Sequence, residues 1–338
     1  MVKFGLGARP DNASAIERAG FDSIWTYDHF APFSHEHGLR DPMTSAGLGA
    51  LPILPLLLAN TTRCNVGTNV LCPTPRYHPV IMAQYFAQLD YLFPGRVIMG
   101  VGAGEAVNET PIVGRFPPHR ERIERLEEAV GLIRKLWTSR DYFNHEGRYY
   151  KSRNLFLYGK PKEKIPIVIS AFGEKSAELA GKAGDGITLY RTKPQKIDLI
   201  LKRFDEAARS ASKDPAAMTK AAYFVGGITP DPVPLVKRIK GPLGLSFLFG
   251  GSMHEPDPRK IDEVAKTLSD DEALQYCTLV PTADDLIGVF ESDIKRGINH
   301  IIMRDFTWAA IQLQLSPPEA AGWPQKVLPY FREKCKQN

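Results

Sequence analysis

Cysteine is scarce in this chain of 338 residues, which has four, and no two of them form a C-x-x-C pair. The spacing of zinc ribbons and of thioredoxin-like redox motifs is therefore missing. Scattered cysteines are typical of reduced, intracellular proteins. The eight histidines show no H-E-x-x-H or other ligand spacing either, so we expect no metal site.

No hydrophobic run of the sequence is long enough to cross a membrane. The most apolar stretch, 50–59, is short and holds two prolines, whereas a transmembrane helix needs about 20 apolar residues. A helix in a protein core explains this stretch better. The start of the chain also lacks the long apolar segment of a signal peptide. We therefore expect a cytoplasmic protein with no membrane partner.

The sequence has little excess charge of either sign. Its 43 Lys and Arg against 38 Asp and Glu leave a formal net charge of +5, and no basic run is long enough to form a basic patch. We therefore expect no nucleic-acid partner. Hydrophobic residues make up 43% of the chain and charged residues 24%, which excludes a disordered chain, a coiled coil and a collagen.

Short apolar runs alternate with helical patterns along the chain. Runs that are apolar on both faces are typical of strands in a parallel sheet covered by helices. They lie at 2–7, 23–27, 64–68, 97–102, 167–170, 186–189, 221–226 and 300–303. Eight strands that alternate with helices predict an α/β fold, a (β/α)₈ TIM barrel, and we treat residues 1–338 as a single domain.

Two stretches interrupt this repeat and are predicted to be insertions, at about 140–164 and 229–277. The first alternates and turns like a surface hairpin at 142–150. The second is rich in proline and glycine, and we expect it to lie over the active site as a lid or an oligomer contact. Between the predicted strands, the helical patterns lie at 79–92, 120–139, 174–183, 193–211 and 284–296.

The barrel itself predicts where the chemistry lies, because active sites of TIM barrels are at the carboxyl ends of the strands. His29 follows the second predicted strand and Glu105 follows the fourth. A neutral histidine can accept a hydroxyl proton near pH 7, and a nearby carboxylate can orient it or take part in proton transfer. The alternative is structural: His29 would cap a turn, and Glu105 would complement a helix dipole.

Two turns are candidates for phosphate binding. Residues 100–104 are rich in glycine but lack the G-x-G-x-x-G spacing and the acidic ribose partner of dinucleotide sites. Residues 171–175 lie between a strand and the start of a helix, whose free N–H groups could hold a phosphate. An ordinary turn between strand and helix is the alternative for this second stretch.

The sequence Gly-Ala-Gly-Glu-Ala-Val-Asn-Glu at 102–109, with Asp-His-Phe at 28–30 and Arg-Tyr-His-Pro at 76–79, resembles the luciferase-like superfamily. Within it, the chain resembles the branch that uses the deazaflavin coenzyme F420, which includes secondary alcohol dehydrogenases and glucose-6-phosphate dehydrogenases. The similarity covers nearly the whole chain and implies a (β/α)₈ barrel that forms a homodimer.

The resemblance also implies roles for single residues. His29 matches the histidine that contacts the alcohol oxygen of the substrate, and Glu105 matches the carboxylate that manages a proton at the deazaflavin ring. The Asn69–Val70 peptide matches the position of a non-prolyl cis bond that supports the ring. Contacts with coenzyme F420 are implied for Asp28, Asn69, Val70, Cys72, Asn108, Ser170, Ala171, Phe172 and Gly173.

Departures from the family concern the substrate side. Phe33 stands where the family has a tryptophan that donates to the substrate oxygen, and the glutamate proposed as a base in the sugar-phosphate enzymes has no match. Of the four groups that hold the sugar phosphate in those enzymes, only Lys193 remains. The other three positions are occupied by Tyr190, Ser252 and Tyr276.

These departures argue against glucose 6-phosphate, because a dianionic phosphate needs several charge-assisted hydrogen bonds to offset its desolvation. We expect a more apolar substrate pocket near Phe33, Tyr190, Tyr276 and Phe249, which favours a small alcohol, a ketone or another uncharged substrate. The remaining Lys193 is expected at the same pocket.

Three functions follow from the sequence. The first is an F420-dependent oxidoreductase that transfers a hydride between the deazaflavin and a small alcohol or carbonyl compound, with His29 and Glu105 as catalytic residues. The second is an FMN-dependent luciferase-like monooxygenase, which shares the fold but needs a reductase and oxygen. The third is a barrel that binds a deazaflavin without catalysis, which the missing tryptophan and glutamate suggest.

Overall fold

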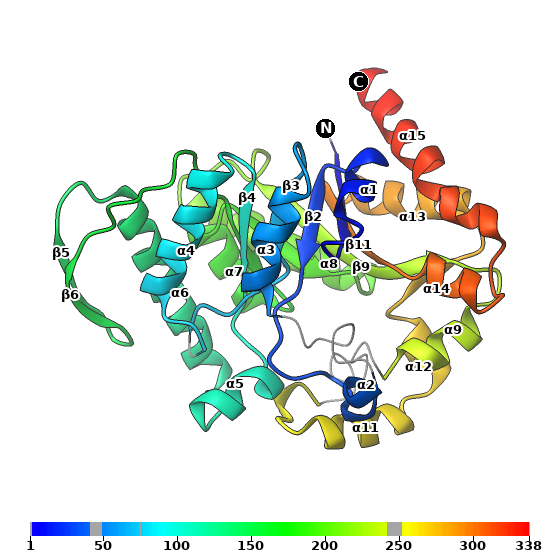
Figure 1. The fold of residues 1–338 in the computed structure, drawn as a ribbon, viewed down its shortest axis with the longest axis horizontal. Helices are drawn as coiled ribbons and strands as arrows, with labels where there is room; N and C mark the ends of the chain where they lie inside the picture. The colour runs from blue at the N-terminus through cyan, green and yellow to red at the C-terminus, as the bar shows by residue number, and fades with distance from the viewer. Residues whose placement is uncertain (1, 41–48, 75, 242–251, 338) are drawn as a thin grey trace.

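The computed structural model describes residues 2–40, 49–74, 76–241 and 252–337. Within them, eight parallel strands pair in a closed ring, because β8 pairs with β9, and β11 pairs with both β9 and β1 (Figure 1). This confirms the predicted (β/α)₈ TIM barrel. The barrel strands are β1 (Lys3–Gly7), β2 (Ser23–Thr26), β3 (Asn65–Thr68), β4 (Val97–Val101), β7 (Ile167–Ser170), β8 (Gly186–Tyr190), β9 (Thr219–Ile228) and β11 (His300–Asp305).

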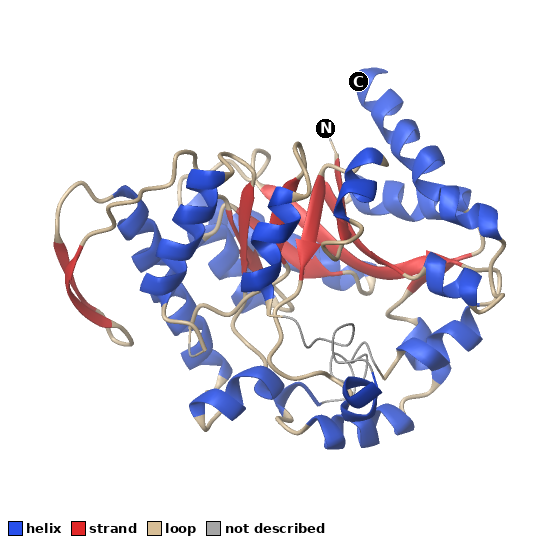
Figure 2. Cartoon of the chain, viewed as in Figure 1, coloured by secondary structure: helices blue, strands red, loops and turns tan. Residues whose placement is uncertain are grey.

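Helices surround the barrel (Figure 2). In α6, the buried residues include Leu126, Val130 and Ile133, which recur at the spacing of one helical face. No helix of the described residues is both long and apolar enough to cross a membrane. The helices that follow or precede barrel strands are α1 (Ala13–Arg18), α3 (Ala50–Ala59), α4 (Pro79–Leu92), α6 (His119–Thr138), α7 (Glu174–Ala183), α8 (Pro194–Ser210), α13 (Ala283–Lys295) and α15 (Trp323–Gln337).

Further short elements lie beyond the carboxyl ends of the strands, where α2, α5 and α11 form the side of the molecule away from both termini (Figure 1). The segment 229–277 supplies several of them, and β10 extends the sheet beside β9. These elements are α2 (His35–Arg40), α5 (Ala106–Val113), α9 (Pro232–Ile239), η1 (Ser252–His254), α11 (Pro258–Thr267), α12 (Asp270–Leu274), β10 (Thr278–Val280), α14 (Thr307–Gln312) and η2 (Pro318–Gly322).

The hairpin predicted at 142–150 is present, with its turn at the end of that range. Its strands β5 (Phe143–Glu146) and β6 (Lys151–Leu155) pair antiparallel. The hairpin stands away from the barrel, at the left of Figure 1. It lies far from the carboxyl ends of the barrel strands and takes no part in the site described below.

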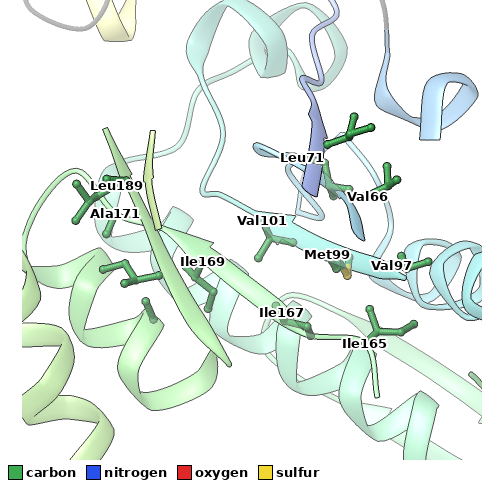
Figure 3. Packing of buried hydrophobic residues seen from close by; sticks show 14 of the residues in the cluster. Val66, Leu71, Val97, Met99, Val101, Ile165, Ile167, Ile169, Ala171 and Leu189 are labelled. Atoms are coloured by element: carbon green, nitrogen blue, oxygen red, sulfur yellow. The ribbon is translucent and has the colours of Figure 1, made fainter. Parts of the chain in front are cut away.

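The main hydrophobic core lies between the barrel and its helices. Successive outward positions of neighbouring strands are filled by branched apolar side chains, such as Val97 and Val101 of β4 and Ile167 and Ile169 of β7 (Figure 3). All four are at most 1% exposed. Burial on both faces explains why these strands appear as unbroken apolar runs in the sequence.

Large side chains fill the inside of the barrel where neighbouring strands carry glycine. Trp25 is fully buried there, and an added Cβ at Gly5 or at Gly67 would lie 2.6 Å from its ring. An added Cβ at Gly7 would overlap the hydroxyl of Tyr27. The rings of Trp25 and Tyr27 therefore occupy space that the glycines leave free. Tyr27 also lines the cavity at the carboxyl ends of the strands, which is described below.

Candidate active site

A cavity of about 210 Å³ opens at the carboxyl ends of the barrel strands. Its walls come from segments that follow β2, β3, β4, β7 and β8, which are far apart in the sequence. The position agrees with the rule that TIM barrels carry their active sites at this end. The residues predicted from the sequence that line it are Asp28, His29, Phe33, Asn69, Val70, Cys72, Glu105, Asn108, Ser170, Phe172 and Tyr190.

Asn108, in the first turn of α5, connects His29 with Glu105. Its Nδ2 donates to Nδ1 of His29 at 3.1 Å and to Oε2 of Glu105 at 2.9 Å. Its Oδ1 accepts hydrogen bonds from the backbone N–H groups of Phe30 at 2.8 Å and Ala31 at 3.2 Å. The two backbone donors fix the orientation of the amide, because a flipped amide would place its NH₂ group against them.

This orientation determines where His29 carries its hydrogen. Nδ1 faces a donor and must accept, so the neutral imidazole has its hydrogen on Nε2. Burial, helped by the charges of Arg76 and Arg304, lowers the pKa of His29 to about 3. The ring is therefore neutral near pH 7 and offers an N–H donor at Nε2. Phe33 packs edge-on against the ring, with centroids 4.7 Å apart.

The pKa of Glu105 is shifted in the opposite direction to that of His29. Burial and the neighbouring Glu109 raise the pKa of Glu105 to about 7, against the charge of Arg76 and the hydrogen bond from Asn108. Its Oε2 lies 3.9 Å from Nδ1 of His29. A carboxyl group with this pKa can hold or release a proton near neutral pH.

A buried ion network supports the wall behind these residues. Arg76 donates to Oδ2 of Asp28 at 2.5 Å and lies 3.7 Å from Oε1 of Glu109. The side chain of Asp28 is fully buried, and that of Arg76 is 6% exposed. Oδ1 of Asp28 also accepts from the backbone of Ala50 at 2.9 Å and from the Tyr77 hydroxyl at 3.2 Å. The network ties the loops after β2 and β3 to helices α3 and α5.

The loop after β3 forms one flat wall of the cavity. The Asn69–Val70 peptide is cis, as the sequence resemblance predicted. Across from it, an added Cβ at Gly102 would lie 2.7 Å from Cγ2 of Val70 and 3.7 Å from Cβ of Ser170. Beside them, the buried Cys72 contacts the Thr74 hydroxyl at 2.9 Å, and burial raises the pKa of its thiol.

The amino end of α7 forms another edge of the cavity. Gly173 is its N-cap residue, no side chain caps the helix there, and open space surrounds the position of a Cβ. Phe172 and Ser176, on either side of this N-terminus, line the cavity. A helix start with free N–H groups is suited to an anion such as a phosphate.

The cavity floor consists of tyrosines and one arginine. Tyr190 and Tyr223 stack edge-on at 5.7 Å between ring centroids, and Tyr27 and Tyr223 do so at 5.8 Å. The Tyr190 hydroxyl donates to the backbone carbonyl of Tyr276 at 2.9 Å. Arg304, in β11, lies over the Tyr27 ring at 5.3 Å. The floor is therefore aromatic with a single positive charge.

The fold, together with this site, can be compared with known proteins. The family model of luciferase-like monooxygenases matches residues 6–231. The chain belongs to the luciferase-like family. The matched segment of this luciferase-like protein includes the end of β1 and all strands from β2 to β9, and with them every strand end around the cavity except that of β11.

Relatives of this luciferase-like protein include F420-dependent enzymes. It is 36% identical to an F420-dependent glucose-6-phosphate dehydrogenase of Segniliparus rotundus, over 85% of this chain and 84% of the relative. A second such dehydrogenase, of Kineococcus radiotolerans, is 35% identical over 89% and 87% of the two chains. The solved F420-dependent secondary alcohol dehydrogenase in complex with an F420-acetone adduct has a TM-score of 0.85 at 30% identity, and covers 97% of this chain and 98% of its own.

Some residues that the resemblance implied lie elsewhere in this luciferase-like protein. In the described part of the chain, the cavity lining does not include Ala171, which is fully buried in the core, or Gly173. Lys193 is exposed and precedes α8. Tyr276 meets Tyr190 through its backbone carbonyl. Phe249 lies outside the described residues.

Sequence reasoning also missed residues of the site. Arg76 and Glu109 belong to the stretches that carried the family resemblance but received no role. Tyr223 and Arg304 line the cavity from β9 and β11. Arg304 directly follows the predicted strand 300–303, so the rule that selected His29 and Glu105 could have found it too.

Proposed function

We propose that this protein is a coenzyme F420-dependent oxidoreductase, which transfers a hydride between the deazaflavin and a small alcohol or carbonyl compound. The similarity to the F420-dependent dehydrogenases described above supports coenzyme F420 as the cofactor. The observation that carries the proposal is the hydrogen-bonded series His29–Asn108–Glu105 in the cavity at the strand ends. It places an N–H donor and a proton carrier side by side.

The residues of the cavity fit a deazaflavin. Val70, Gly102 and Ser170 form a closely packed wall of the cavity, because the lack of a side chain at 102 lets Val70 approach its backbone. A flat ring can lie on this wall. The N-terminus of α7, with Gly173 and Ser176, would hold the phosphate of the tail. When bound, coenzyme F420 supplies the hydride chemistry at its ring.

His29 acts on the substrate oxygen as a hydrogen-bond donor. Its Nε2–H would polarise a substrate carbonyl and stabilise negative charge that develops on the oxygen, as a neutral imidazole can. The sequence assigned His29 to take and return the hydroxyl proton, which requires the tautomer with its hydrogen on Nδ1. The Asn108 donor at Nδ1 favours the other tautomer, so in this proposal the hydroxyl proton is exchanged with water in the cavity. Glu105 remains the group that holds a proton on the cofactor side.

The surroundings of the cavity disfavour a sugar phosphate as the substrate. The Tyr190 hydroxyl already donates to a backbone carbonyl, and Lys193 is exposed outside the cavity lining of the described residues. A phosphate dianion would lack the several charged partners that offset its desolvation. A small alcohol or carbonyl compound fits the aromatic floor better.

A fluorescence-quench titration tests the cofactor. We expect oxidised coenzyme F420 to bind at least about tenfold more tightly than FMN, the cofactor of the monooxygenase alternative. Tighter binding of FMN would contradict the proposal, and binding without turnover of any alcohol or carbonyl compound would favour a non-catalytic barrel. Gly102→Leu serves as the matched variant, since its Cβ would lie 2.7 Å from Cγ2 of Val70 and would displace this wall, so quenching should be lost.

The pKa of Glu105 predicts a pH dependence. With a pKa of about 7, Glu105 is protonated below this pH and can give a proton to the cofactor side, so alcohol oxidation should slow as the pH rises through about 7. Carbonyl reduction, for which Glu105 must take up that proton, should accelerate. Glu105→Gln should remove this inflection from the pH profile of kcat. Glu109→Gln should retain the inflection at a lower pH, because Glu109 raises the pKa of Glu105. An unchanged profile in Glu105→Gln would refute the assignment.

The family resemblance also leads us to propose a homodimer in the cytoplasm. Sedimentation velocity of the purified protein tests the assembly, and we expect one species with twice the mass of the chain. A single species with the mass of one chain would contradict it. Cell fractionation with an antibody against the native protein tests the location.

A further inference from the structure

Arg304 places a positive charge in the cavity, and no carboxylate of the described residues pairs with it. The side chain is half-buried and lines the cavity together with His29, Tyr190 and Tyr223. None of the ion pairs among the described residues includes it. The nearest acidic residue in the sequence, Asp305, is engaged elsewhere, because it accepts from Thr307 and from the Trp323 ring.

Other arginines around the barrel that are buried or half-buried have hydrogen-bonding partners. Arg76 is paired with Asp28 at 2.5 Å. Arg191 is paired with Asp293 at 2.7 Å. Arg122 has no carboxylate partner but donates to the backbone carbonyls of 117 and 104. Arg304 differs from these cations, because the contacts that the structure describes for it are with neutral aromatic groups.

The groups around Arg304 cannot neutralise it. Its guanidinium lies 5.3 Å from the centroid of Tyr27 and 5.6 Å from that of Phe306. Burial raises the pKa of Tyr223, against the charge and the hydrogen bond of Arg304, so this hydroxyl stays neutral. Aromatic rings offset only part of the desolvation of a cation. A half-buried cation that lines an open cavity, with no carboxylate paired to it among the described residues, can bind an anion from outside the chain.

We propose that Arg304 binds a carboxylate of the substrate, so that the physiological substrate is an oxo acid or the corresponding hydroxy acid. This inference rests on the proposed oxidoreductase function and narrows its substrate. The planar guanidinium can bind a carboxylate through two parallel hydrogen bonds. One arginine suits a single negative charge, whereas a phosphate dianion would need more partners.

The proposal revises the expectation of an uncharged substrate. That expectation followed from the absence of the phosphate-binding groups at Tyr190 and Tyr276, which lie on or beside β8 and β10. Arg304 comes from β11, a strand on which the sequence comparison placed no substrate contact. This chain can therefore lack the phosphate-binding groups of the sugar-phosphate enzymes and still bind a carboxylate, because the two sites use different strands.

The test compares acids with their neutral counterparts. Pyruvate, acetoacetate and levulinate are each measured against their methyl esters, by calorimetric binding to the protein and by kcat/KM with reduced coenzyme F420. We expect at least one acid to be preferred over its ester in the native protein. Arg304→Gln should weaken binding and kcat/KM for that acid at least about 30-fold, while the values for the ester change less than about threefold.

Two further variants serve as controls. Arg304→Lys keeps the charge without the planar fork and should fall between the native protein and Arg304→Gln. Arg153→Gln removes an exposed arginine of the hairpin and should change neither acid nor ester. Equal loss for acid and ester in Arg304→Gln, or no preference for any acid, would overturn the proposal.

The remaining outcomes separate this inference from the proposed function. If Arg304→Gln weakens the binding of coenzyme F420 instead, Arg304 serves the cofactor and the inference is wrong. If an acid binds through Arg304 but no compound of the series is turned over, the carboxylate site stands and the proposed oxidoreductase function fails. Binding is therefore measured with and without the cofactor.

Discussion

His29→Ala is expected to lower kcat about 100- to 1,000-fold, the loss seen when one donor to a developing oxyanion is removed. The affinity for coenzyme F420 should change less than about twofold, because His29 faces Asn108 and Phe33 rather than the ring wall at Val70. Steady-state turnover and the quench titration measure the two quantities. Retained turnover would contradict any direct role of His29 at the substrate.

Two companion variants distinguish a donor from a base. His29→Gln keeps an N–H donor but has no basic nitrogen, so it should recover at least about tenfold of the activity that His29→Ala loses. Asn108→Asp replaces the donor to Nδ1 by an acceptor, which favours a hydrogen on Nδ1 and leaves Nε2 without one. It should therefore lose about as much activity as His29→Ala. If instead Asn108→Asp kept most of the activity while His29→Gln lost it, His29 would act as a base.

Arg76→Met is expected to destabilise the fold by about 3–5 kcal/mol, the range for removing one partner of a buried ion pair. Asp28 would keep its negative charge in a fully buried position, and Glu109 would lose its nearest cation. The free energy of unfolding in urea measures the loss. Because the network joins the loop that carries His29 to α5, whose N-cap is Glu105, activity should fall in parallel at temperatures near unfolding.

The double variant Arg76→Met, Asp28→Asn tests the physical cause. Asparagine keeps the oxygen that accepts from Ala50 and from Tyr77 but carries no charge. If the uncompensated charge causes the loss, the double variant should recover at least about 1 kcal/mol relative to Arg76→Met. A double variant no more stable than the single one would assign the loss to packing instead.

The barrel could be predicted because its strands are buried on both faces. Such strands are short unbroken apolar runs between helical patterns, and the run at 167–170 agrees with β7 to the residue. Helices with one apolar face were equally clear, as at 79–92 for α4 and 174–183 for α7. The core thus leaves a direct signature in the sequence.

The elements of 229–277 could not be predicted in the same way. They are short, and their positions depend on contacts with other segments, as α12 contacts α9 and α11 contacts α2. Local signals were nevertheless present: Ser269 and Glu272 form a capping box at the start of α12. Such caps mark where a short helix begins without indicating which surface it packs against.

Many of the residues that line the cavity could be predicted from the sequence, but their hydrogen bonding could not. His29 and Glu105 follow from the rule for strand ends. The role of Asn108 does not, because its orientation depends on backbone N–H groups at 30 and 31, which belong to another loop. The sequence likewise could not show that aromatic rings surround Arg304, because one of these rings, that of Tyr27, comes from a segment far away in the sequence.

The glycines of β1 and β3 have a consequence for how this enzyme class can diversify. Gly7 leaves the space that the Tyr27 hydroxyl occupies, and Gly5 and Gly67 do so for Trp25. The position of the Tyr27 ring, which lines the cavity, therefore depends on Gly7 of the neighbouring strand β1, which is not among the described lining residues. A substitution at Gly7 can therefore change the depth of the cavity while every residue that lines the cavity stays the same.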